Sequence, residues 1–78
     1  PSDGSSVRLG STVTVLDEEF DETMVYKIVG SQEANVMERK VSEDSPFGKA
    51  LMGAKEGDEV MVEAPVGTIV YRIVKIER

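Results

Sequence analysis

Apolar and polar residues alternate along four stretches of the chain, and a period of two residues is typical of half-buried β-strands. In the first stretch Val13 and Val15 share one face, while the neighbouring threonines lie on the other. Polar or glycine-containing segments separate the four stretches, as expected for turns. We therefore predict strands over residues 7–16, 23–29, 59–63 and 68–76.

The last of these stretches is apolar on both faces. In strict alternation, one face carries Ile69, Tyr71 and Ile73, and the other carries Val70, Val74 and Ile76. Such a strand is predicted to lie inside a sheet or to be covered on both sides. A shorter strand is predicted over residues 38–42, where Arg39 and Lys40 would discourage pairing with the edge of another sheet.

Residues 44–53 depart from the alternation and have the start and stop signals of a short helix. Ser45 can cap the first turn by accepting a free backbone N–H, and Pro46 fits the first helical position. Asp44 places a negative charge beside the positive end of the helix dipole. Gly53 can end the helix in a left-handed conformation. The residues spaced to form its apolar face are Phe47, Ala50 and Leu51.

Two strands, a short strand, one helix and two more strands predict an α+β fold. We expect a small twisted antiparallel β-sheet that carries one short α-helix. The 78 residues suffice for one domain, which we place at residues 7–78. Residues 1–6 are small and polar, so we expect a linker or a disordered tail there.

Composition narrows the functions that this domain could have. Acidic residues outnumber basic residues by 15 to 9, and the resulting repulsion of phosphates argues against DNA or RNA binding. Cysteine and histidine are absent, which removes thiolate ligands and the commonest general base. Neighbouring carboxylates are expected by chance in so acidic a chain. We therefore predict no catalytic residue, no metal site and no cofactor. No apolar run approaches the roughly 20 residues of a membrane-spanning helix.

The segment that leads into the predicted helix has two interpretations. Helix capping alone explains Ser45 and Pro46, but it explains neither the aromatic Phe47 nor the acidic Asp44. A rigid turn with an apolar tip and an acidic rim would also suit docking on a partner protein. The residues by themselves leave both interpretations open.

The order of the motifs along the chain resembles the C-terminal domain of the bacterial Gre transcript cleavage factors, the GreA branch more than the GreB branch. The resemblance covers nearly the whole chain from Val7 onward. Asn35 stands where the family usually has Asp, and Phe47 stands where Ile is common. The similar segments are VRLGSTVT (7–14), YKIVG (26–30) with Glu33 and Ala34, VS (41–42), DSPFGKALMG (44–53), GDEV (57–60), PVG (65–67) and YRI (71–73).

The resemblance implies an FKBP-like fold and a cytoplasmic role in transcription elongation. Gre factors join this domain to an N-terminal antiparallel coiled coil. The globular domain docks on bacterial RNA polymerase at the rim of the secondary channel, against the β′ subunit. The coiled coil enters the channel, where acids at its tip help to hold Mg²⁺ at the polymerase active site and stimulate cleavage of backtracked RNA. The docking residues implied here are Asp44, Ser45, Pro46 and Phe47.

The sequence contains no heptad repeat, so we expect the coiled coil to be absent from this chain. The fragment should then bind polymerase without stimulating cleavage. One alternative is a Gre-like channel protein that inhibits or regulates polymerase without cleavage. A second is an FKBP-type prolyl isomerase, although two Phe and two Tyr supply little aromatic lining for its pocket. A third is a structural domain that has no partner.

Overall fold

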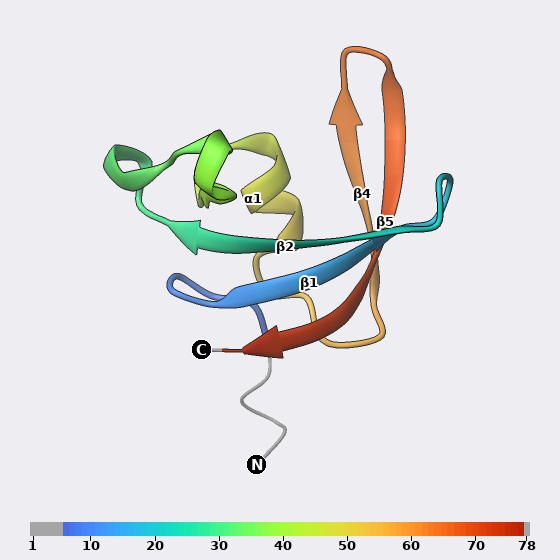
Figure 1. The fold of residues 1–78 in the computed structure, drawn as a ribbon, viewed down its shortest axis with the longest axis horizontal. Helices are drawn as coiled ribbons and strands as arrows, with labels where there is room; N and C mark the ends of the chain where they lie inside the picture. The colour runs from blue at the N-terminus through green and yellow to red at the C-terminus, as the bar shows by residue number, and fades with distance from the viewer. Residues whose placement is uncertain (1–5, 78) are drawn as a thin grey trace.

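The computed structural model describes residues 6–77 and places five strands in one sheet (Figure 1). The strands are β1 (Thr12–Asp17), β2 (Glu22–Val29), β3 (Lys40–Ser42), β4 (Glu59–Ala64) and β5 (Gly67–Glu77). Among the described residues they are joined by the α-helix α1 (Pro46–Leu51) and the 3-10 helices η2 (Ser31–Glu33) and η3 (Val36–Glu38). The predicted α+β class is confirmed. The predicted linker lies, apart from Ser6, outside the described residues.

The sheet has the strand order β3-β2-β1-β5-β4. The pairs β1–β2, β1–β5 and β4–β5 are antiparallel as expected, whereas β3 runs parallel to β2. The parallel direction follows from the connection, because η2 and η3 carry the chain back along β2 before β3 begins. Arg39 completes this return in a left-handed conformation with φ of 61°. The sheet is therefore mixed, and β3 forms one of its edges.

A β-bulge at Val74 interrupts β5. Ile73 lies opposite Val15, and Ile76, three positions later, lies opposite Val13 on the same face. The extra residue leaves Val74 48% exposed. Strict alternation placed Ile76 on the face of Val74, and that prediction is wrong because a bulge reverses the alternation. Because of the bulge, residues on both sides of Val74 contribute to the same core.

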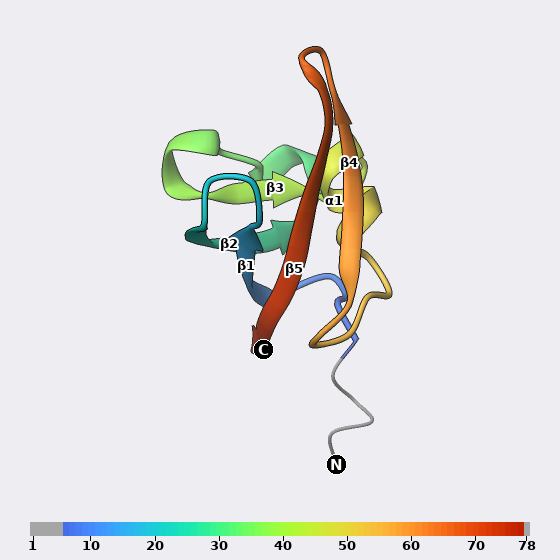
Figure 2. The same ribbon diagram turned by 90° about the vertical axis from the view of Figure 1, so that its right-hand side faces the viewer.

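The hydrophobic core lies between the curled sheet and α1. Figure 2 shows α1 beside β4, and Figure 1 shows β4 and β5 crossing β1 and β2 at a steep angle. Because the sheet is curved, the single helix can cover its core face, which it could not do on a flat sheet. No helix within residues 6–77 combines the length and apolar character needed to cross a membrane. The apolar side chains buried most completely are Val13, Val15, Ile28, Leu51 and Ile73.

Candidate partner-docking site

The start of α1 is a corner whose shape is fixed by hydrogen bonds. Ser45 Oγ accepts from the Gly48 backbone N–H at 3.0 Å and donates to the Ser42 carbonyl at 2.7 Å. Pro46 is the first residue of the helix, and the N-cap Ser45 has extended backbone angles. The predicted capping is therefore confirmed. Asp44 and Pro46 are exposed, so their side chains remain accessible.

Gly48 places the helix directly against the end of β3. It is buried, and a Cβ at this position would overlap the carbonyl oxygen of Ser42. After Leu51 the helix ends at Gly53, which has the predicted positive φ, here 83°. The Gly53 N–H donates to the carbonyl of Val7 at 2.9 Å, which ties the end of the helix to the start of the domain.

Phe47 does not form the exposed apolar tip that we expected. Its ring is half-buried and lies between two tyrosines, in edge-to-face contact with both. The ring centroids are 4.8 Å apart for Tyr26 and 5.2 Å apart for Tyr71. Aromatic pairs in this geometry are favourable beyond their burial alone. Phe47 therefore anchors the corner to the sheet, while Pro46 faces solvent.

The two tyrosines are the part of this site that was not predicted from the sequence, where both simply fall within predicted strands. Both are only half-buried in the structure. The guanidinium of Arg39 lies 5.7 Å from the centroid of the Tyr26 ring. Burial raises the pKa of Tyr71, and the neighbouring Tyr26 and Asp17 raise it further. A signal was available, since Tyr-Lys-Ile in β2 and Tyr-Arg-Ile in β5 repeat one pattern.

The site thus has two adjoining parts. We call Asp44, Ser45 and Pro46 the proline corner, and Tyr26, Phe47 and Tyr71 the aromatic cluster. A shallow hollow of about 360 Å³ flanks the corner, and its acidic lining residues are Glu33, Glu43 and Asp44. Among residues 6–77 no group of three or more potential ligands is arranged to hold a metal ion. The arrangement presents the rigid ring of Pro46, the edges of the aromatic rings and the negative charge of the acidic hollow. These features suit contact with another protein.

Comparison with known proteins identifies the family. Residues 2–78 match the family described as "Transcription elongation factor, GreA/GreB, C-term". The chain is 47% identical over 73 residues to transcription elongation factor GreA of Hyphomonas neptunium, covering 94% of this chain and 46% of that protein. It is 50% identical over 72 residues to GreA of Thermoanaerobacter pseudethanolicus, covering 92% and 46%. The chain thus spans about half the length of the curated relatives that it matches.

Solved structures agree with this result. The fold is similar to that of GreA factor homolog 1 (Gfh1) of Thermus thermophilus, with a TM-score of 0.83 and 36% identity over 95% of this chain and 49% of that one. It is also similar to a GreA/GreB elongation factor from Nitrosomonas europaea, with a TM-score of 0.79 and 29% identity over 95% and 62%. The chain belongs to the GreA/GreB family of transcription elongation factors and corresponds to the C-terminal domain of that family.

Proposed function

We propose that this domain docks a GreA-type elongation factor on RNA polymerase through the proline corner and the aromatic cluster. The observation that carries the proposal is the pair of neighbours Pro46 and Phe47. The first is exposed, while the second is locked between two tyrosine rings. A surface that is rigid before binding loses little conformational entropy on association. Pro46 and Asp44 are therefore presented in a fixed position to a partner.

The partner we propose is bacterial RNA polymerase in the cytoplasm, contacted through its β′ subunit at the rim of the secondary channel. Membership in the family supports this choice, and so does the charge of the site. The acidic hollow beside the corner favours a partner surface that carries basic residues. In the whole factor, docking would place a coiled coil in the channel and so promote cleavage of backtracked RNA. The domain itself would contribute no catalytic group, and the Mg²⁺ would belong to the polymerase.

A competition experiment tests the docking role directly. The chain should displace an intact GreA-type factor from RNA polymerase, and Pro46→Ala and Asp44→Ala should each weaken displacement by about tenfold or more. A tenfold loss corresponds to about 1.4 kcal/mol, which is modest for a contact at the centre of an interface. Pro65→Ala is the matched control, because Pro65 is an exposed proline in the distant β4–β5 turn.

Thermal unfolding of the same variants separates docking from packing. Both substitutions at the corner should leave the melting temperature close to that of the unmodified chain, because both side chains are exposed. Weaker competition at unchanged stability supports the proposal. Failure of the unmodified chain to compete, or equal losses for Pro46→Ala and Pro65→Ala, would contradict it.

The second candidate is a Gre-like channel protein that regulates polymerase without stimulating cleavage. Gfh1 structures match this chain at 36–37% identity, below the 47–50% of the GreA proteins named above. That difference favours the GreA-type function. The half of the relatives that this chain does not span would decide between the two. A transcript cleavage assay on stalled polymerase with the full-length protein tests this, since only a cleavage factor shortens the RNA.

The geometry of the aromatic cluster weighs against a prolyl isomerase. Such an enzyme needs an open aromatic pocket that can receive a proline ring. Here Phe47 occupies the space between Tyr26 and Tyr71, with centroid distances of 4.8 and 5.2 Å. A proline-peptide isomerisation assay with the purified chain should show no rate above the uncatalysed background.

A further inference from the structure

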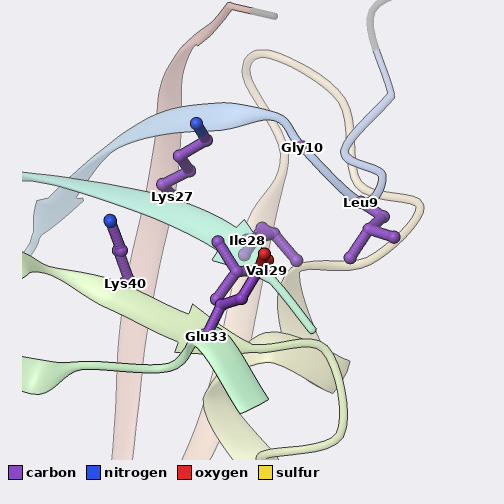
Figure 3. A pocket seen from close by; sticks show the side chains of 7 residues that line it. All are labelled: Leu9, Gly10, Lys27, Ile28, Val29, Glu33 and Lys40. Atoms are coloured by element: carbon purple, nitrogen blue, oxygen red, sulfur yellow. The ribbon is translucent and has the colours of Figure 1, made fainter. Parts of the chain in front are cut away.

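A pocket of about 330 Å³ lies beside β2 and β3 and has no role in the proposed docking (Figure 3). Ile28 points into the core, so its neighbours on the strand, Lys27 and Val29, project from the opposite face of the sheet. The pocket is therefore on the side of the sheet away from the core. Its lining residues are Leu9, Gly10, Lys27, Ile28, Val29, Glu33 and Lys40.

Two lysines stand next to each other in this pocket. The parallel register of β2 and β3 places Lys27 opposite Lys40, so their side chains leave neighbouring strands on the same face. Like charges directly opposite each other on a sheet are destabilising. Glu38 lies 3.0 Å from the ammonium of Lys40 and offsets part of this repulsion. Figure 3 shows both ammonium groups on one side of the pocket.

The other side of the pocket carries Leu9 and the carboxylate of Glu33, and the backbone holds it in place. Leu9 is 53% exposed although it is a large apolar residue, and it lies across the pocket from the lysines (Figure 3). The turn that carries it is fixed by a 2.8 Å hydrogen bond from the Gly10 N–H to the Ile28 carbonyl. Gly10 has a φ of 91° and adds no side chain to the mouth. The pocket thus combines two neighbouring positive charges, one apolar side chain held in a fixed position, and one carboxylate, that of Glu33.

We propose that this pocket binds a small organic phosphate, with the phosphate between Lys27 and Lys40 and the apolar part against Leu9. Lysine binds phosphate as a point charge, and two ammonium groups match the double negative charge of a phosphate monoester. The net charge of −6 does not by itself prevent this, because exposed charges more than about 8 Å away are screened at physiological ionic strength. The nearby carboxylates of Glu33 and Glu38 oppose binding, and the two ammonium groups must outweigh them. A small anion can approach the lysine pair alone. A long nucleic-acid backbone would also meet the acidic residues on the rest of the surface.

Titration followed by amide NMR tests the site, with phenyl phosphate as the probe. Saturable shifts are expected at the amides of residues 27–29 and 40. Lys27→Met and Lys40→Met should each weaken binding by about fivefold or more, as expected for the loss of one charge close to the anion. Glu38→Gln should strengthen binding, because it frees the ammonium of Lys40. Lys55→Met is the matched control, since it removes the same charge from an exposed turn away from the pocket.

Inorganic phosphate distinguishes an organic ligand from the free anion. Phenyl phosphate should bind more tightly, and Leu9→Ala should reduce this advantage without changing the affinity for inorganic phosphate. Equal affinity for both probes would overturn the assignment to an organic phosphate. Equal effects of Lys27→Met and Lys55→Met, or shifts spread over the whole domain, would overturn the site itself. Dispersed amide spectra confirm that each variant is folded, and the result does not depend on whether the proline corner binds polymerase.

Discussion

Two tetrapeptides in this chain share one pattern of a small residue, proline, a large apolar residue and glycine. Residues 45–48 read Ser-Pro-Phe-Gly and begin α1, whereas residues 64–67 read Ala-Pro-Val-Gly and form the β4–β5 turn. Phe47 is packed between two tyrosines, but Val66 is 89% exposed. The same local pattern therefore gives an anchored corner in one place and an open turn in the other.

The glycines explain the difference most clearly. Gly48 is required by space, because a Cβ there would overlap the carbonyl oxygen of Ser42. Gly67 is required by its backbone, which has a φ of 130°, and no atom lies within 4 Å of the position of a Cβ. The first conformation is imposed by the rest of the fold, and the second is set within the turn. A docking surface needs a conformation of the Gly48 kind, because contacts with other parts of the fold then hold the segment in place.

The glycines also give the largest expected difference in stability. Gly48→Ala should lower the free energy of unfolding by about 3 kcal/mol, because the new methyl group meets backbone that cannot move aside. Gly67→Ala should cost about 1 to 2 kcal/mol, from the strained φ alone. Urea unfolding of both variants measures the difference. A smaller loss for Gly48→Ala than for Gly67→Ala would contradict the comparison.

The apolar residues should give the next largest difference. Phe47→Ala should cost about 2 to 3 kcal/mol, since it removes a half-buried ring and two edge-to-face contacts. Val66→Ala should change stability by less than about 0.5 kcal/mol, because the side chain is exposed. Thermal and urea unfolding measure both. Similar losses for the two variants would show that Phe47 does not anchor the corner.

The first residue of each tetrapeptide should give a smaller difference. Ser45→Ala removes the acceptor for the Gly48 N–H and should cost about 1 kcal/mol. Ala64→Ser, the reverse change in the hairpin, should alter stability by less than about 0.5 kcal/mol. Hydrogen exchange at the Gly48 amide gives a local readout. Unchanged protection of that amide in Ser45→Ala would contradict the capping role.

The aromatic cluster should also respond to alkaline pH, with the smallest effect of the four. Burial raises the pKa of Tyr71 in the folded chain, so folding favours the neutral phenol. The resulting stability is present below the unfolded pKa of about 10 and is lost as the pH rises through the folded value. Tyr71→Phe should lose less stability over this interval than the unmodified chain. Equal pH profiles for the two chains would contradict the direction of the shift.

The sequence predicts best those features that depend on neighbouring residues. Ser45 and Pro46 identified the start of the helix because capping involves only the next three positions. The bulge at Val74 could not be predicted, because it depends on the register of β5 against the distant β1. The parallel pairing of β3 could not be predicted either, because nothing in its three residues fixes a direction.

The candidate site shows the same limit. The proline corner was named from the sequence, but the inward direction of Phe47 depends on rings that lie about twenty residues before it and after it. The adjacency of Lys27 and Lys40 likewise exists only in the parallel register. Residue types and local turns were predictable, whereas which side chains meet was decided by packing between segments far apart in the chain.

The position of β5 inside the sheet, between β1 and β4, has a consequence for synthesis on the ribosome. β1 pairs on one side with β2, which follows at once, and on the other with β5, roughly 50 residues later. At about 5 to 20 residues per second, the β1–β2 hairpin therefore emerges several seconds before the strand that completes it. Throughout that delay α1 is the helix that can cover the core face of the hairpin, and the edge of β1 that will pair with β5 stays open to pairing with another chain.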